Sequence, residues 1–281
     1  MEKVVYLLNG KTDVNTIDAS CLLIPVKGLS TRSVFALTIE EIIALKNNTN
    51  KEIFLLCDAI ILENEREDII AVFPKLKDIA DKIFFNDVIY YMEALKYNYL
   101  ENMVFYSPTF ALSVEDINSW KKLGIKNIII SKECEYNGYI SILNSVKDVN
   151  LGMLALGYPQ IYYSRRQMLT SFKKEYNHID FNIDLQLTIK EKTREMKMPI
   201  YEDERGTYIF AGEVFFVNKI LREFKELGMK YFIVDPIFID ESNKLIELVN
   251  DGLNGIDSSD KLNRPTSSFM LFREMVNNYD K

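Results

Sequence analysis

The sequence predicts an α/β protein with a complete or partial (β/α) barrel and an antiparallel β insertion near residues 173–211. The first observation is that short, largely apolar segments alternate with amphipathic segments from the N-terminus to about residue 172. That alternation is typical of a parallel sheet whose two faces are both covered by helices. The second observation is a change after residue 172, where apolar and polar residues alternate with the period of two of a half-exposed strand.

Seven strands are expected before residue 172, each a short apolar run that ends at a polar or turn residue. Seven strands in this order favour a TIM-like barrel over an open doubly wound sheet. The lack of a glycine-rich phosphate loop after the first strand also disfavours a dinucleotide-binding sheet. The expected strands are Val4–Leu8, Cys21–Val26, Ile53–Cys57, Ile83–Phe85, Met103–Tyr106, Lys126–Ser131 and Leu151–Leu156.

Capping residues mark several of the helices between these strands. Thr38 and Glu41 form a capping-box pattern, and Ser113 and Gly124 are a typical N-cap and C-terminal stop for another helix. Pro74 lies inside a third helix, where proline predicts a kink or a break. The helices are expected at Phe35–Lys46, Arg66–Lys82, 88–97, Ser113–Leu123 and Tyr139–Val146.

The second half of the chain is expected to hold the β insertion and then to complete the barrel. Phe181–Ile189 alternates apolar and polar residues, which predicts an antiparallel strand. Met198–Tyr201 and Thr207–Phe210 flank an acidic segment that ends in Gly206, which predicts a β-hairpin. The tail at 256–281 carries apolar and aromatic residues and is expected to pack on the body. The last regular elements are expected at Glu213–Leu227, Tyr231–Val234 and Glu241–Leu253.

Composition and charge narrow the class of protein. The length fits one large α/β domain or two modest ones. We expect one domain over 1–281, with its barrel-like part at 1–172 and 212–255. The net charge of −7 argues against an autonomous nucleic-acid binder, because phosphate contacts need a basic surface. We expect a cytoplasmic protein outside the membrane, since no apolar run suits a secretion signal or a membrane span. The cysteines are far apart and adjoin apolar runs, so buried reduced thiols are expected at Cys21, Cys57 and Cys134.

One segment, GYPQIYYSRRQMLTS at residues 157–171, combines a strand end with a charged helix start. The apolar run before it ends at Gly157, and Ser164 is expected as the N-cap of a helix. Arg165 and Arg166 then fall in the first helical turn, where the helix dipole disfavours positive charge. A bound anion or a facing carboxylate would compensate this charge. A solvated arginine pair at an ordinary strand–loop–helix corner explains the same residues equally well.

Polar residues follow several other expected strands. In a barrel the carboxyl ends of all strands meet at one face, where active sites are built. Glu133 and Asp235 are the candidate catalytic carboxylates, and we expect at least one of the two arginines within ion-pair reach of one of them. Alternatively, the two carboxylates only neutralise the arginines as a structural ion-pair layer. The candidate substrate-binding residues are Ser107, Thr109, Ser164, Arg165 and Arg166.

The segment 157–171, together with PIYEDERGTYIF at residues 199–210, resembles peptidase family U32, the collagenase-like proteases. The order of features resembles that family through Asp235, and the Arg264–Pro265 pair resembles its closing segment. The resemblance covers nearly the whole chain, and the string at 199–210 is its most specific part. It implies a barrel with a β insertion, followed by a strand that ends in a carboxylate.

The resemblance also implies a cofactor that this sequence does not support. Many members of the family hold an iron–sulphur cluster on four cysteines. Three of those positions match Gln160, Gln167 and Phe216 here, and these side chains supply no thiolate. No cysteine follows Cys134. We therefore expect no cluster, no metal site and no other cofactor in this chain.

The functions implied by the resemblance are divided. Some members are named as peptidases, and others resemble proteins that hydroxylate a tRNA wobble uridine, a ribosomal RNA base or the ubiquinone ring. This sequence looks most like the smaller partner of a paired system that hydroxylates tRNA uridine at position 5 with prephenate as the hydroxyl source. The resemblance then implies a heterodimer with a cluster-bearing U32 paralogue, an anionic ligand such as prephenate, and tRNA bound only through the complex.

Two other hypotheses stay open. A peptidase of the Ser–His or Cys–His type would need His178, the only histidine, which lies in a polar connector and is expected to be solvated. No His-Glu-x-x-His zinc motif occurs, whereas an aspartate pair is not excluded by the sequence. The third hypothesis is a degenerate member retained as a binding or scaffold protein. Acidity and the missing cysteines favour the first and third hypotheses over the peptidase.

Overall fold

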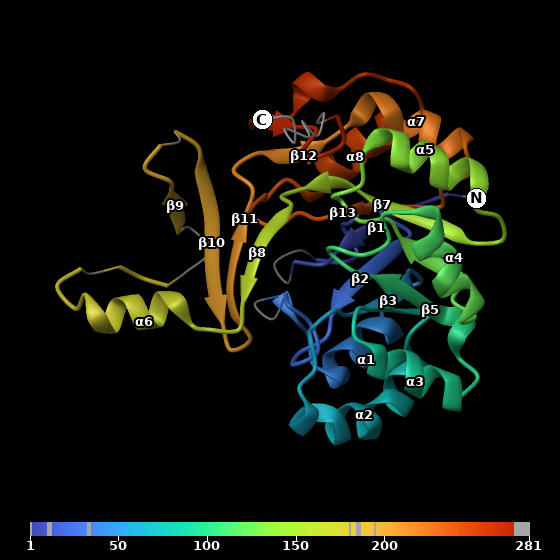
Figure 1. Ribbon diagram of the computed structural model, residues 1–281, viewed down its shortest axis with the longest axis horizontal. Coiled ribbons are helices and arrows are strands. Elements are labelled where there is room, and N and C mark those ends of the chain that lie inside the picture. The colour runs from blue at the N-terminus through green and yellow to red at the C-terminus, as the bar shows by residue number, and fades with distance from the viewer. Residues whose placement is uncertain are drawn as a thin grey trace, which may run out of the picture.

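The computed structural model of this chain describes residues 2–9, 13–32, 35–179, 181–183, 187–193 and 195–272. Its main feature is a barrel of parallel strands: β1 (Lys3–Leu7), β2 (Cys21–Pro25), β3 (Glu52–Cys57), β4 (Lys82–Phe85), β5 (Met103–Tyr106), β6 (Asn127–Ile129), β7 (Asn150–Gly157) and β13 (Tyr231–Val234). Strands β1 to β7 pair in chain order, and β13 closes the barrel by pairing with both β1 and β7. The predicted barrel is therefore confirmed (Figure 1).

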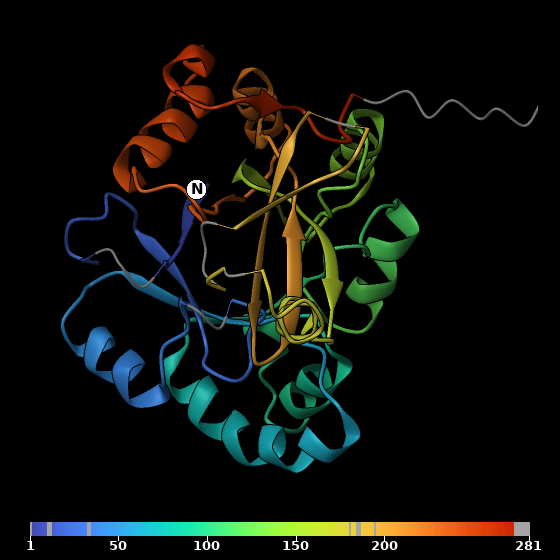
Figure 2. The same cartoon turned by 90° about the vertical axis from the view of Figure 1, so that its left-hand side faces the viewer.

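Helices surround the barrel (Figure 2). Strand side chains alternate between two apolar cores, so that Phe54 and Phe84 stack at 5.8 Å inside the barrel while their sequence neighbours pack against the helices. The capping box at Thr38 and Glu41 is formed, and α2 continues through Pro74 without a break. The helices are α1 (Ile39–Asn47), α2 (Arg66–Ile79), α3 (Val88–Lys96), α4 (Val114–Lys122), α5 (Tyr136–Ser145), α7 (Asn218–Glu226) and α8 (Ser242–Leu253).

The β insertion forms a second, antiparallel sheet, and we call residues 160–210 the arm. Its elements are β8 (Gln160–Ser164), α6 (Met168–Glu175), β9 (Thr188–Lys190), β10 (Lys197–Asp203) and β11 (Gly206–Phe210). The strands are arranged in the order β8-β11-β10-β9. The arm projects from one side of the barrel in Figure 1 and lies in front of the barrel opening in Figure 2. The predicted antiparallel insertion is thus confirmed, and its sheet also includes β8, upstream of residue 173.

The expected helix start at Ser164 is wrong. Ser164 ends β8, because this segment pairs with β11 and places Tyr163 opposite Tyr208. Helix α6 begins only at Met168. Arg165 and Arg166 consequently lie in the connector between β8 and α6, before the first turn of the helix.

Two more elements differ from the expectation. A strand was expected over Phe181–Ile189. Among the described residues of that range, only Thr188 and Ile189 belong to a strand, β9. Residues 184–186 lie outside the described part. The helix expected from Glu213 begins at Asn218, because the buried residues before it form β12 (Val214–Phe216). Strand β12 pairs antiparallel with the end of β7. This pairing gives the backbone groups of β12 hydrogen-bond partners while its apolar side chains stay buried.

The C-terminal segment returns to the body. Strand β14 (Thr266–Ser267) pairs in parallel with β12. Leu271 is buried, and its carbonyl accepts a hydrogen bond of 2.8 Å from the Tyr136 amide at the start of α5. Residues 273–281 of the expected tail lie outside the described part. Among the described residues, no helix has both the length and the apolar character that a membrane span requires.

The end of β7 packs unusually closely against the end of β13. Gly157, at the end of β7, has a φ of +153°, and a Cβ atom there would lie 2.7 Å from the carbonyl oxygen of Asp235 and 2.8 Å from its Cβ. The Asp235 amide also donates a 2.8 Å hydrogen bond to the Leu156 carbonyl. The absence of a side chain at Gly157 therefore lets Asp235 approach the neighbouring strand and fixes where its carboxylate lies.

Replacing Gly157 by alanine is expected to lower the free energy of unfolding by about 2–4 kcal/mol, because backbone strain adds to an overpacked contact. Urea denaturation measures this change. Gly228→Ala is the matched control: Gly228 also has a positive φ, of +101°, but a Cβ there would meet nothing within 4 Å. The control should cost only about 1–2 kcal/mol, from backbone strain alone. Equal losses in the two variants would contradict the proposed steric role of Gly157.

Candidate functional site

A cavity of about 110 Å³ lies at the carboxyl end of the barrel strands. Its walls come from the loops that follow β2 to β7 and β13, and from the first strand of the arm. This is the face on which barrels of this type build their sites. The chemically distinctive wall residues are the polar group Arg32, Asp58, Ser107, Lys132 and Asp235 and the aromatic group Tyr106, Tyr158 and Tyr163.

A buried ion pair between Arg32 and Asp235 joins opposite ends of the sequence at this cavity. Arg32 Nη2 lies 2.6 Å from Asp235 Oδ2, and the two side chains are only 8% and 5% exposed. The second carboxylate oxygen of Asp235 accepts a 3.1 Å hydrogen bond from the Ile237 amide. Burial alone would lower the pKa of Arg32, but Asp235 more than offsets this and holds the pKa above its ordinary value. The guanidinium is therefore a permanent cation at the cavity wall.

The arm covers part of the Arg32 guanidinium, but one guanidinium nitrogen has no hydrogen-bond partner among the described residues. Its Cζ lies 4.8 Å from the centroid of the Phe210 ring, which is a cation–π contact. Arg32 Nη1 is buried and has no hydrogen-bond partner among the described residues. Buried polar groups are normally hydrogen-bonded, so an unpaired nitrogen at a cavity wall is an unusual feature of this site.

The loop that carries Arg32 is held from two directions. Asp58, directly after β3, accepts hydrogen bonds from Ser30 Oγ (2.8 Å), from the Thr31 amide (2.9 Å) and from Thr31 Oγ1 (2.6 Å). From the arm, the Tyr201 hydroxyl donates a 2.7 Å hydrogen bond to the Thr31 carbonyl. The barrel and the arm together therefore fix the position of Arg32.

Lys132 is a second cation at the cavity. Its side chain is 9% exposed, and its Nζ donates a 3.1 Å hydrogen bond to the Pro108 carbonyl. The Glu133 carboxylate is 4.0 Å away, which is an ion pair but not a hydrogen bond. Burial lowers the pKa of the Lys132 ammonium; Glu133 opposes that shift and the nearby charge of Arg32 adds to it. A bound anion would stabilise both cations.

Tyrosines form the aromatic part of the wall. Burial raises the pKa of Tyr106 and of Tyr163, so both phenols stay protonated near neutral pH. The Tyr163 ring stacks on Tyr208 at 5.0 Å, and its hydroxyl donates a 3.0 Å hydrogen bond to the Arg205 carbonyl. The Tyr158 ring packs edge-on against Phe238 at 5.9 Å. These contacts place rigid rings and neutral hydroxyl groups beside the two cations.

The structure brings together only part of the residue set expected from the sequence. Asp235 and Ser107 line the cavity and are buried. Thr109 and Glu133 lie exposed in the loops after β5 and β6, outside the wall. The remaining expected residues, at the end of β8 and just after it on the arm, are also absent from the wall, namely Ser164, Arg165 and Arg166.

The expected ion pair between Arg165 or Arg166 and Asp235 or Glu133 is not formed. Asp235 pairs with Arg32, and Glu133 lies beside Lys132. The reason is that β8 continues away from the strand end as part of the arm, which carries the two arginines to the rim. Arg32, Asp58 and Lys132 were not expected from the sequence, although each also follows a barrel strand.

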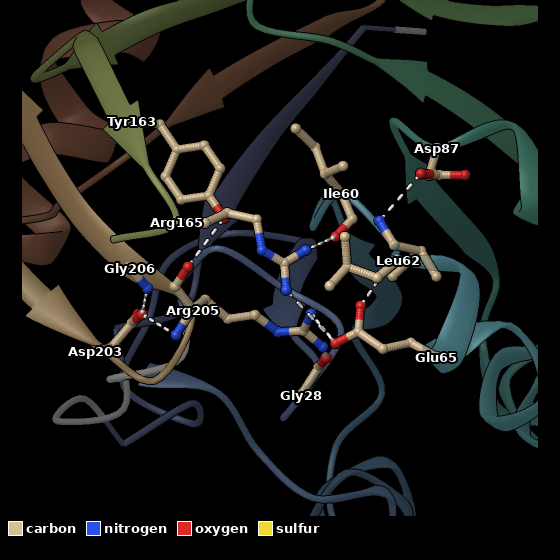
Figure 3. Close-up of polar contacts among 11 residues, drawn as sticks. Gly28, Ile60, Leu62, Glu65, Asp87, Tyr163, Arg165, Asp203, Arg205 and Gly206 are labelled. Carbon is tan, nitrogen blue, oxygen red and sulfur yellow. Dashed lines mark hydrogen bonds and ion pairs between the residues drawn. The ribbon is translucent and has the colours of Figure 1, made fainter. Parts of the chain in front are cut away.

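Arg165 instead belongs to an arginine cluster with Arg205 and Glu65, shown in Figure 3. Arg205 Nη1 lies 2.8 Å from Glu65 Oε1, and its Nη2 donates to the Gly28 carbonyl. Arg165 donates a 3.2 Å hydrogen bond to the Ile60 carbonyl, and its Nη2 is 3.9 Å from Glu65. The cluster therefore fastens the β10–β11 turn of the arm to the loops that follow β2 and β3.

A family model described as peptidase family U32 matches residues 14–250. The chain belongs to peptidase family U32. Within the matched residues lie both segments that carry the family resemblance, 157–171 and 199–210.

Two individual comparisons add detail. The tRNA hydroxylation protein P2 of Bacillus subtilis (strain 168) is 22% identical to this U32 chain over 184 residues. That match covers 57% of this chain and 59% of the relative, so the chain matches less than two thirds of the relative's length. Among solved structures, a cube-shaped, highly porous protein cage designed by fusing symmetric oligomeric domains has a TM-score of 0.45 at 7% identity, over 90% of this chain and 74% of its own.

The side chains at the expected cluster positions do not fit the iron–sulphur cluster that many U32 members hold. Gln160 is part of the cavity wall, Gln167 donates a 3.3 Å hydrogen bond to the Asp203 carbonyl, and Phe216 is buried in β12. None of these side chains is a thiolate ligand. No group of three or more His, Cys, Asp or Glu side chains that could hold a metal ion occurs among the described residues.

The cysteines and the histidine also lie away from the cavity wall. Cys21, Cys57 and Cys134 are buried, as predicted, and burial raises the pKa of Cys21 and Cys134 to about 12, so both stay as thiols near neutral pH. His178 is exposed on the arm after α6, where its ring lies 6.3 Å from the ring of Tyr176. The solvated position expected for His178 is therefore confirmed.

Asp235→Asn is expected to lower the free energy of unfolding by about 3–5 kcal/mol, because it leaves the buried Arg32 charge without its counter-ion. Urea denaturation monitored by circular dichroism measures the change. Glu101→Gln, which removes a partner of Lys126 in an ion pair that is mostly exposed, is the control and should leave the unfolding midpoint unchanged. A midpoint for Asp235→Asn equal to that of the wild type would show that the buried pair does not stabilise the barrel mouth.

Arg205→Ala is expected to loosen the arm from the barrel mouth and to cost about 1–3 kcal/mol, because it removes charged hydrogen bonds to Glu65 and Gly28. Hydrogen–deuterium exchange should be faster in β10 and β11 of this variant. Arg165→Ala is the matched control, since this side chain is 36% exposed and its contact with Glu65 is longer. The assignment fails if both variants exchange at the wild-type rate in the arm.

Proposed function

We propose that this chain is the subunit without an iron–sulphur cluster in a pair of U32 proteins that hydroxylates the wobble uridine of tRNA, with prephenate as the hydroxyl source. The observation that carries the proposal is the match to the tRNA hydroxylation protein P2, in a chain whose cluster positions hold Gln160, Gln167 and Phe216. A cluster-bearing paralogue then supplies the metal chemistry, and this chain itself binds no metal and no other cofactor.

The barrel cavity supports the role of an anionic donor. Arg32, which is buried, and Lys132, whose side chain is 9% exposed, place two cations at one small cavity, and carboxylates are among the anionic groups that such cations bind in proteins. In this proposal Ser107 contacts the ligand and Asp235 holds Arg32 in place, whereas Glu133 tunes Lys132. The rim residues face the tRNA or the partner subunit; these are Thr109, Ser164, Arg165 and Arg166.

The charge of the chain supports contact with tRNA through a complex. Its net charge of −7 disfavours unaided binding to a polyanion. The excess of acidic residues lies outside the arm, because residues 160–210 hold nine Lys and Arg against eight Asp and Glu, whereas the whole chain holds 34 against 41. We propose a cytoplasmic heterodimer in which residues 1–281 act as one domain and the partner supplies most of the basic surface.

A peptidase function has less support. His178 is exposed on the arm, and the buried cysteines are protonated thiols rather than activated nucleophiles. The Arg32–Asp235 pair is a structural counter-ion arrangement at a cavity of about 110 Å³, which is small for an extended peptide.

Co-expression tests the proposal directly. In a bacterial strain that lacks tRNA uridine 5-hydroxylation, this chain together with a cluster-bearing U32 paralogue from its own genome is expected to restore the modified nucleoside. Mass spectrometry of digested tRNA measures it. Either protein alone should restore less than about a tenth of the level, since the proposal requires both subunits. Full modification by the paralogue alone, or none by the pair when both proteins are folded and associated, would refute the proposal.

A further inference from the structure

We propose that the outer face of helix α3 binds a second copy of this chain, so that the protein forms a two-fold symmetric dimer through the barrel wall. We call Leu62, Val88, Met92 and Leu95 the α3 patch. In Figure 1 helix α3 lies at the lower right of the barrel, whereas the arm projects to the left. The inference goes beyond the proposed function and does not rest on it.

The first observation is that α3 is apolar on both of its faces. Its inner face is fully buried at Tyr90 and Ala94, as the packing of a barrel helix requires. On its outer face Val88, Met92 and Leu95 recur at the spacing of one helix side, and they are 59%, 49% and 51% exposed. A helix that is apolar all round is normally covered all round, so the outer face of α3 lacks the cover that its composition calls for.

The helices on either side of α3 do not share this feature. The exposed residues of α2 are charged apart from one alanine, and those of α4 are all charged or polar. These residues are Arg66, Glu67, Asp68, Ala71, Lys75 and Asp78 in α2, and Glu115, Ser119 and Lys122 in α4. The exposed apolar surface is therefore specific to α3, and a contiguous apolar patch on an otherwise polar wall marks an interaction site.

The second observation is that a groove lies on each side of Val88. One groove, of about 340 Å³, separates α3 from the loop before α2 and is lined by Leu62, Val88 and Met92. The other, of about 350 Å³, lies between the start of α3 and the loop after β5, and Val88 and Phe110 line it. Val88 is thus a ridge between two grooves. Such a surface fits a copy of itself, because the ridge on one helix can pack into the groove beside the other.

The groove beside Leu62 is held in shape by Asp87. One carboxylate oxygen of Asp87 accepts a 3.1 Å hydrogen bond from the Ile89 amide and caps α3. The other oxygen accepts a 3.0 Å hydrogen bond from the Ile61 amide, so the loop before α2 is tied to the same residue (Figure 3). A groove formed before binding loses little conformational entropy when a partner enters it.

The third observation, the charge at the rim of this groove, selects the partner. Glu63 and Arg66 both line the groove, and their side chains are 93% and 56% exposed. They lie 3.9 Å apart, which is too long for a hydrogen bond, so each can exchange this weak contact for one across an interface. A two-fold axis brings the glutamate of each copy to the arginine of the other. A partner of a single charge sign would instead be repelled by one of the two residues.

Sedimentation velocity of the purified full-length chain tests the association. Between about 1 and 100 µM the sedimentation coefficient is expected to rise from that of a monomer toward that of a dimer, and no larger species should form because a two-fold contact closes on itself. A chain that remains monomeric at about 100 µM would overturn the proposal.

Met92→Glu locates the interface. It places a carboxylate in the centre of the α3 patch, where dimerisation would remove it from water, and the dissociation constant should rise at least about tenfold. Met196→Glu is the matched control, because Met196 is 42% exposed and lies on the arm. The control should associate as the wild type does. If Met196→Glu separates the dimer and Met92→Glu does not, the interface lies on the arm and the assignment to α3 is wrong.

Reversing the rim charges tests the two-fold symmetry. Glu63→Arg and Arg66→Glu should each weaken the dimer by about threefold or more, because like charges then meet at both ends of the interface. The double variant should recover the wild-type dissociation constant, since both signs change together in both copies. Failure of the double variant to recover would rule out a self-complementary contact.

The cluster-bearing paralogue of the proposed function is the alternative occupant of this face. Association of this chain with the paralogue that is lost in Met92→Glu, in a chain that is monomeric on its own, would refute the second copy and assign the face to the heterodimer. A dimer of this chain that is lost in Met92→Glu supports the proposal whether or not the pair modifies tRNA.

Discussion

The buried ion pair between Arg32 and Asp235 is the interaction on which the architecture of the barrel mouth depends. It joins the loop after β2 to the end of β13, two segments that are 203 residues apart in sequence. Two charges taken out of water stabilise a protein only when they are closely paired and their other polar atoms are satisfied. Asp235 meets this condition, because its second oxygen binds the Ile237 amide. Arg32 does not meet it fully, because Nη1 lacks a partner among the described residues, and the cavity lies beside it.

Other residues at the barrel mouth hold this ion pair in place. Gly157 allows Asp235 to lie against β7, and Asp58 orders the Arg32 loop through three hydrogen bonds. The arm packs on the Arg32 loop, since Phe210 stacks against the guanidinium and the Tyr201 hydroxyl donates a hydrogen bond to the Thr31 carbonyl. A lower local dielectric strengthens every charge interaction in the cavity, including one with a ligand. The arm is therefore part of the site as well as an insertion in the fold.

The chain belongs to peptidase family U32 and forms a barrel with an arm. Gln160, Gln167 and Phe216 stand where the resemblance places thiolates. A fold supports many activities because its function depends on the side chains at the strand ends rather than on the strands themselves. The strand-end groups present here are cations, tyrosine hydroxyls and paired carboxylates, which suit the binding of an organic anion.

The sequence by itself determined the barrel, the antiparallel insertion and the family, because apolar periodicity and short motifs are local properties. It also indicated polar candidates after the strands, of which Asp235 and Ser107 line the cavity at the barrel mouth. It failed where a segment could satisfy two patterns: YYSRR at 162–166 fits a helix start, and only pairing with β11 made its first part a strand. Tertiary structure alone decided the partner of Asp235. The nearest candidates by motif were Arg165 and Arg166, but closure of the barrel by β13 brought Asp235 to Arg32, and sequence separation carries no information about that contact.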